Sequence, residues 1–168
     1  MSIENYKNYN LKTNDISNVL ISVIEKINHE DLIKSESKKS KYLEKFFANN
    51  FKIKDGKIEI LKKEHKLHDE KNDKVDLYAK IVIGVQIYHL IIEMDNMRAD
   101  QVTKKLFSRP LLLSSNDEII YVSLLYSTKS NISQYQKECK TYIKGHYKDF
   151  IDRNTNIQYL SFVPQACL

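Results

Sequence analysis

The chain has 168 residues, of which 42% are hydrophobic, and its 27 basic and 22 acidic side chains give a net charge of +5. This composition excludes a disordered chain, predicts a single domain over residues 1–168, and only mildly favours a polyanionic partner. No apolar run approaches the ~20 residues of a membrane helix. Because Cys139 and Cys167 are too few for a disulfide framework or a zinc site, we expect a cytoplasmic protein.

The first third of the chain predicts two helices and a strand. Residues 1–12 are polar and are expected to be held loosely. Apolar residues recur at helical spacing from about residue 14 to 27, and again from about residue 37 to 50. A Lys-Asp-Gly turn signal at 54–56 then predicts a strand from Lys57.

A β-hairpin is predicted over residues 74–95, after a charged stretch (62–74) that is expected to be a loop. Apolar and polar residues alternate on both sides of Gly84-Val85, a pair that suits a type II′ turn. The resulting register makes one face of the hairpin apolar and sets Asp76 opposite Glu93, with Asp95 beside them. A slip of one residue would move Glu93 to the apolar face, so the pattern itself favours this register.

Four elements are predicted after the hairpin. They are a helix from Asn96 to about Ser108, a strand over 118–126, an amphipathic helix over 131–150 and a strand over 157–163. The order α-α-β-β-β-α-β-α-β predicts an α/β fold, in which helices flank a mixed central β-sheet.

The acidic residues of the hairpin predict a metal site. Two carboxylates directly opposite each other on neighbouring strands repel and weaken the sheet, unless a cation lies between them. Asp76, Glu93 and Asp95 offer oxygen ligands and no thiolate, which suits a hard ion such as Mg²⁺. The alternative is that Glu93 and Asp95 only end a strand in solvent.

The same residues carry a family resemblance. Asp76, followed on the next strand by Glu93-Met94-Asp95 within an αβββαβ order, resembles the PD-(D/E)XK nuclease core, and the stretch 91–109 is most similar to Type II restriction endonucleases. The resemblance covers about residues 65–130. Val75 stands where the motif has its proline, and Asp95 where it has its lysine.

The resemblance implies a restriction-endonuclease-like fold and a Mg²⁺-dependent hydrolysis of double-stranded DNA at a short palindromic site. A homodimer is expected, because two identical active sites match a two-fold DNA site. Asp76 and Glu93 would hold the metal, with the carbonyl of Met94 as a further ligand. Asp95 would bind a second metal or orient the attacking water, and Gln101 would position water or phosphate.

Basic residues after the hairpin are expected to contact DNA phosphates, aided by the N-terminus of their helix, whose unpaired N–H groups would point to the acidic site. These residues are Arg98, Lys104, Lys105 and Arg109. A solvated basic face is the alternative for each lysine.

Other charged segments are weighed in the same way. Lys80 lies about 10 Å or more along the strand from Asp76, too far to replace the missing lysine, so a structural role is expected. The stretch from His65 to Glu70 matches no zinc pattern and is expected to contact DNA or solvent. The lysines at 137, 140, 144 and 148 fit a solvated helix face, whereas the basic run over 34–45 better suits DNA backbone contacts.

Two alternatives to a restriction enzyme stay open. The same core serves structure-specific repair and recombination nucleases, such as junction resolvases, which recognise the shape of DNA. The chain is otherwise a catalytically inactive DNA-binding domain, in which Asp95 marks the loss of activity.

Overall fold

The computed structural model describes residues 6–8, 15–35, 38–69, 73–96, 98–113, 116–126, 134–135, 137–139, 141, 149–150 and 153–164. Its elements are β1 (Tyr6–Asn8), α1 (Asp15–Ile24), α2 (His29–Lys34), α3 (Lys39–Asn50), β2 (Gly56–Lys66), β3 (Lys74–Ile83), β4 (Gln86–Asn96), α4 (Ala99–Ser108), the 3₁₀ helix η2 (Pro110–Leu112), β5 (Glu118–Tyr126) and β6 (Ile157–Phe162). None of the helices in these ranges is both long and apolar enough to cross a membrane.

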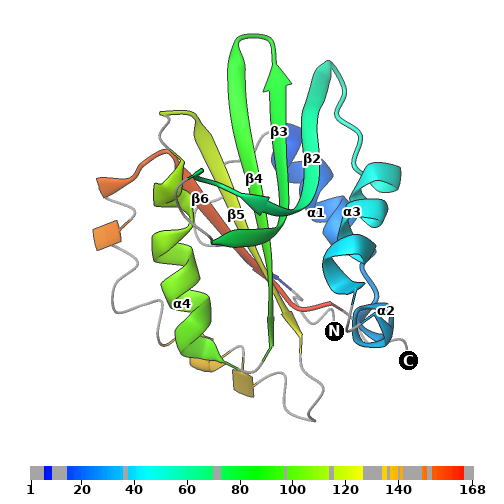
Figure 1. Ribbon diagram of the computed structural model, residues 1–168, viewed down its shortest axis with the longest axis vertical. Helices are drawn as coiled ribbons and strands as arrows, with labels where there is room; N and C mark the ends of the chain where they lie inside the picture. The colour runs from blue at the N-terminus through cyan, green and yellow to red at the C-terminus, as the bar shows by residue number, and fades with distance from the viewer. Residues whose placement is uncertain are drawn as a thin grey trace.

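A mixed six-stranded sheet runs through the molecule in the order β1-β6-β5-β4-β3-β2 (Figure 1). β2, β3 and β4 are antiparallel, β4, β5 and β6 are parallel, and β1 pairs antiparallel with β6. The predicted α/β class and mixed central sheet are therefore confirmed. β1 and α2 were not predicted, and β1 makes residues 6–8 of the segment expected to be loose part of the sheet.

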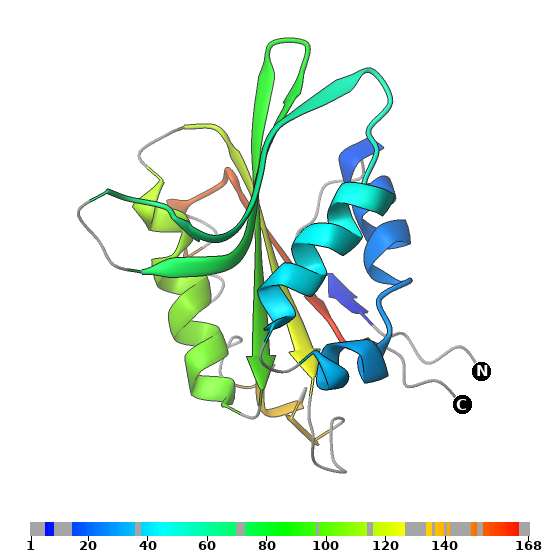
Figure 2. The same cartoon turned by 45° about the vertical axis from the view of Figure 1, so that its right-hand side comes forward.

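Helices cover both faces of the sheet (Figure 2). On one face, α1 and α3 pack their buried residues against alternate residues of β3, β4 and β5. On the other face, α4 contributes Leu106 to a second cluster that contains Ile91 and Tyr121. Most of the predicted helix over 131–150 lies outside the described residues.

The β3–β4 hairpin has the predicted register. The paired residues run from Ile83 with Gln86 to Leu77 with Ile92. Gly84 has a φ of +57°, the left-handed value that the first central position of a type II′ turn requires. The hairpin therefore places Glu93 and Asp95 two and four residues beyond Ile91 on the same strand face.

β3 leaves β4 at Asp76. The paired residues of the two strands end at Leu77 and Ile92, and the end of β2 and the start of β3 curl over towards α4 (Figures 1 and 2). Val75 packs in the cluster on the α4 face, although Leu77 packs on the opposite face. The alternation of the strand is thus broken at Asp76.

β2 shows a matching irregularity next to Asp76. Glu64 has a φ of +48°, an uncommon conformation for a residue other than glycine. Beyond it, His65 and Lys66 still pair with β3. The prediction of a loop from residue 62 was therefore wrong, because the strand continues through its charged end by curling rather than by stopping.

A buried hydrogen-bond chain links β3, β4 and the residue before β5. The Tyr78 hydroxyl lies 2.7 Å from Nδ1 of His89, and Nε2 of His89 lies 3.0 Å from Asp117. Burial raises the pKa of Tyr78 to about 12, so its hydroxyl keeps its proton. The Asp117 carboxylate can only accept, so Nε2–H of His89 is the donor in that hydrogen bond. Lys80 pairs opposite His89 as predicted, and its ion pair with Glu59 agrees with a structural role.

Candidate active site

Glu93 and Asp95 form a buried acidic pair on the α4 face of β4. Alternate residues of a strand share one face, so the two carboxylates lie on the same side of the sheet. Only 2% of Glu93 and 4% of Asp95 is exposed. Charges buried this deeply are costly unless they are paired, so their partners decide what the site can do.

Lys105 of α4 bridges the two carboxylates. Its Nζ lies 3.0 Å from Oε2 of Glu93 and 2.7 Å from Oδ1 of Asp95. Arg109, directly after the helix, lies with Nη1 2.8 Å from Asp73 and with Nε 3.4 Å from Oε1 of Glu93. The latter is an ion pair without hydrogen-bond geometry, since both atoms lack a hydrogen-bond partner.

The acidic pair therefore meets the last turn of α4 and its C-terminal flank. The expectation that the N-terminus of the helix would point to the carboxylates was wrong. The reason is the short connection between β4, which ends at Asn96, and α4, which begins at Ala99. It folds the helix back along the strand, so that Lys105 and Arg109 reach Asp95 and Glu93.

Burial dominates the electrostatics of the pair. It raises the pKa of Glu93 to about 8, against the opposing effect of Lys105 and with the help of Asp76 and Asp95. Burial likewise raises the pKa of Asp95, again opposed by Lys105. Burial alone would lower the pKa of Lys105, but the two carboxylates reverse this effect and raise it. Lys105 is thus held in its charged form.

The pKa of Glu93 makes a prediction for stability. Because the folded protein raises this pKa from 4.5 to about 8, the folded state binds the proton more tightly than the unfolded state. The contribution to stability is complete below about pH 4.5 and is lost as the pH rises through about 8. In EDTA, the free energy of unfolding should fall by a few kcal/mol across this range.

Glu93→Gln should flatten this pH dependence, because glutamine does not titrate. The measurement is urea unfolding at several pH values. As a matched control, Glu59→Gln on β2 should leave the slope as it is, since Glu59 lies at the surface. Equal slopes for the wild type and Glu93→Gln would contradict the raised pKa.

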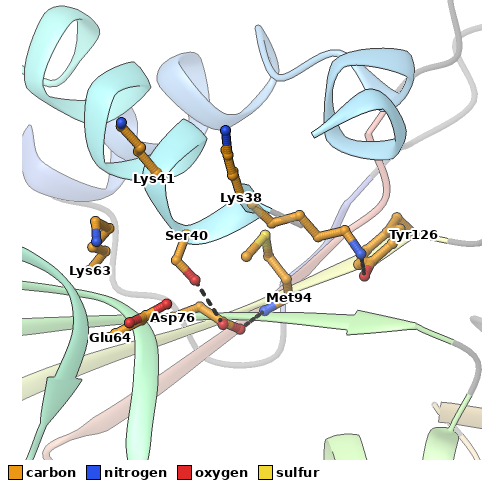
Figure 3. Close-up of a pocket in the computed structure, with 9 residues that line it drawn as sticks. Lys38, Ser40, Lys41, Lys63, Glu64, Asp76, Met94 and Tyr126 are labelled. Carbon is orange, nitrogen blue, oxygen red and sulfur yellow. Dashed lines mark hydrogen bonds between the residues drawn. The ribbon is translucent and has the colours of Figure 1, made fainter. Parts of the chain in front are cut away.

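Asp76 points towards Ser40 of α3 and the backbone of Met94 (Figure 3), yet it lies near enough to Glu93 and Asp95 to raise the pKa of both. Its Oδ2 accepts a hydrogen bond of 2.8 Å from the backbone N–H of Met94, and its Oδ1 accepts one of 3.3 Å from the Ser40 hydroxyl of α3. The predicted pairing of Asp76 directly opposite Glu93 is not formed, because the paired residues of the two strands end at Leu77 and Ile92. Because β3 leaves β4 here, the Asp76 side chain occupies the place of the lost strand partner of Met94.

Each member of the acidic pair has one oxygen without a hydrogen-bond partner, although Oε1 of Glu93 lies 3.4 Å from Nε of Arg109. Oε1 of Glu93 and Oδ2 of Asp95 are buried and have no hydrogen-bond partner. Two carboxylate oxygens fit a hard divalent cation such as Mg²⁺, which takes one or two carboxylates and several waters. Within the described ranges, no three acidic, histidine or cysteine side chains converge on one metal position.

The other predicted residues of α4 gather around Asp100 instead. Arg98 and Lys104 make ion pairs of 3.0 and 3.4 Å with Asp100, and the Gln101 amide donates a hydrogen bond of 3.1 Å to it. These side chains form a surface cluster at the start of the helix. The Gln101 amide therefore binds Asp100 rather than Glu93 or Asp95. Lys105, which was expected to contact a DNA phosphate, lies beside these two carboxylates instead.

Asp73, a partner of Arg109, was missed by the sequence analysis because it lies in the stretch expected to be a loop. The sequence did contain a signal for the position of Lys105 beside the carboxylates, namely its spacing from Arg109. Lys105 and Arg109 are four residues apart and thus on one helix face. Of the lysines assigned to the solvated face of the helix over 131–150, only Lys137 is among the described residues, and it is exposed.

Comparisons with known proteins do not assign a family or a function to this site. No protein-family model, curated protein or solved structure matches the chain.

Proposed function

We propose that the chain is a Mg²⁺-dependent endonuclease that hydrolyses phosphodiester bonds of double-stranded DNA at a short palindromic site, as a homodimer. The observation that carries the proposal is the buried pair of Glu93 and Asp95, each with one oxygen that has no hydrogen-bond partner. The resemblance of residues 91–109 to Type II restriction endonucleases supplies the substrate class.

Each residue of the acidic pair, and Lys105 beside it, would have its own role in binding the metal ion and the phosphate. Glu93 Oε1 and Asp95 Oδ2 would hold the metal ion. A bound Mg²⁺ supplies charge for the phosphoryl oxygens and lowers the pKa of a coordinated water. Lys105 keeps the two carboxylates close together by neutralising part of their charge, and together with Arg109 it would offer positive charge to a phosphate that reaches them.

A second function, a DNA-binding domain without catalysis, is favoured by two specific contacts. Lys105 already compensates the acidic pair, and Asp76 is committed to Met94 and Ser40. Such a protein needs no metal. It would bind DNA equally well in Mg²⁺ and in EDTA.

Cleavage of unmethylated plasmid and phage DNA is the experiment that tests the proposal. We expect discrete fragments in Mg²⁺ and none in EDTA, with fragment ends that reveal one short site. Cleavage of four-way junctions but not of linear DNA would instead favour a structure-specific nuclease. Intact DNA in both Mg²⁺ and Mn²⁺ would contradict the proposed nuclease activity and would favour the DNA-binding domain without catalysis.

A further inference from the structure

A pocket of about 360 Å³ lies on the face of the sheet that α3 covers, opposite to the acidic pair (Figure 3). Its wall is formed by the start of α3, the end of β2, the start of β3 and the ends of β4 and β5. The lining residues are Lys38, Lys39, Ser40, Lys41, Lys63, Glu64, Asp76, Met94 and Tyr126. We call it the lysine pocket.

The lysine pocket has an excess of positive charge, with four lysines against two carboxylates. In the described part of the chain, no carboxylate lies within ion-pair distance of Lys38, Lys41 or Lys63. Lys39 donates a hydrogen bond to the Tyr126 hydroxyl, and its ammonium group lies 4.4 Å from the centre of that ring. Three of the four lysines of the pocket thus form no ion pair with a described residue, although the Glu44 carboxylate lies near Lys63, whose backbone N–H donates a hydrogen bond of 3.1 Å to it.

The acidic residues of the pocket do not cancel this charge. Asp76 is hydrogen-bonded by two donors, the Met94 N–H and the Ser40 hydroxyl, which spread its negative charge. Glu64 is exposed to solvent, which screens its carboxylate. Solvent screens the exposed Lys38 and Lys41 in the same way, so the preference for an anion rests on the excess of four lysines over two carboxylates.

The backbone at the start of α3 adds to the same preference. Lys38 is the N-cap residue and makes no side-chain cap, and the first turn contains no acidic side chain. Among the residues that the structure describes, the first turn therefore offers no acidic side chain to compensate the positive end of the helix dipole. A phosphate group is a suitable partner for this end of a helix.

We propose that the lysine pocket binds a phosphate group, and that this phosphate belongs to the backbone of a bound DNA strand. The second half of this inference rests on the proposed function. Met94 lines the pocket and lies between Glu93 and Asp95 on β4, so the phosphate would be held across the sheet from the acidic pair. Lysines bind phosphate as point charges, so the pocket would supply affinity but no sequence recognition.

The test compares two double variants that remove the same charge. Lys41→Met/Lys63→Met changes the pocket, whereas Lys54→Met/Lys57→Met removes two exposed lysines outside both the pocket and the basic run over 34–45. Binding of a short fluorescent duplex is measured by anisotropy in EDTA, over a series of salt concentrations. We expect the pocket variant to bind about tenfold more weakly near 0.1 M salt, with a salt slope smaller by up to ~2.

The control variant should stay within about threefold of the wild type under the same conditions. Equal losses in both double variants would overturn the proposal, because net charge alone would then explain them. Lys41→Glu serves as a second pocket variant, since Lys41 is exposed and its replacement does not disturb the core. It should weaken binding at least as much as the double variant.

Inorganic phosphate and pyrophosphate form the second arm, with ³¹P line broadening as the measurement. Loss of phosphate binding together with unchanged duplex binding in the pocket variants would assign the pocket to a free phosphate compound and overturn the DNA part. Because both arms are carried out in EDTA, they are independent of cleavage. A protein that binds DNA through the pocket but never cleaves it would contradict only the proposed nuclease.

Discussion

Lys105→Met is expected to lower the free energy of unfolding by about 3 kcal/mol at neutral pH. The substitution removes the ammonium group that lies 3.0 Å from Glu93 and 2.7 Å from Asp95 and leaves the carboxylates buried without it. Because the Lys105 side chain is 26% exposed, the loss should lie at the lower end of the range for broken buried pairs. Urea unfolding with an unchanged slope against urea would measure it.

Lys104→Met is the matched control, since its ion pair with Asp100 lies at the surface and should contribute less than about 1 kcal/mol. At pH values above 8, where Glu93 loses its proton, addition of Glu93→Gln to Lys105→Met should recover part of the lost stability by removing one buried charge. Mg²⁺ should raise the melting temperature of Lys105→Met more than that of the wild type, because the ion no longer competes with an ammonium group. No gain in Mg²⁺ for either protein would count against a metal at the acidic pair.

Glu93→Gln is expected to reduce the rate of plasmid cleavage by about 10³-fold or more, because it removes one of two metal-binding carboxylates. Glutamine has nearly the shape of glutamate and keeps an oxygen beside Lys105, so the fold should be retained. The measurement is the initial rate of linear product at saturating Mg²⁺, with the far-ultraviolet circular dichroism spectrum as a check of folding.

Glu59→Gln is again the control, and it should cleave at the wild-type rate. Metal binding by Glu93 requires the loss of its proton, whose pKa is about 8. Cleavage at low Mg²⁺ should therefore speed up as the pH rises through about 8. A Glu93→Gln variant that cleaves as fast as Glu59→Gln would remove Glu93 from the catalytic residues.

The parts of the fold that the sequence predicted are those with a strong local pattern. Alternation around Gly84-Val85 predicted the hairpin register, because a slip would expose apolar residues and bury charged ones. The helix from about residue 37 and the strand over 118–126 also match α3 and β5 within two residues. The nuclease-like core within this α/β fold stays a prediction.

The parts that the sequence could not predict depend on tertiary geometry. The direction in which the Asp76 side chain points depends on where β3 leaves β4, and no residue type marks that point in the sequence. The contact of Lys105 with Glu93 requires the helix to fold back along its strand, which depends on the few residues between them. Periodicity assigns side chains to the faces of one element and does not say which face of its neighbour they meet.

The carboxyl end of β4 is bonded on one side by β5, whereas on the other side the paired residues stop at Ile92 and only the Asp76 side chain holds the Met94 N–H. Local opening of a strand end costs less free energy when fewer backbone bonds must break. Amide hydrogens should accordingly exchange faster at this end than in the middle of the strand. The two carboxylates, buried in the closed state, would become accessible through such a small movement of one strand end, with the rest of the sheet intact.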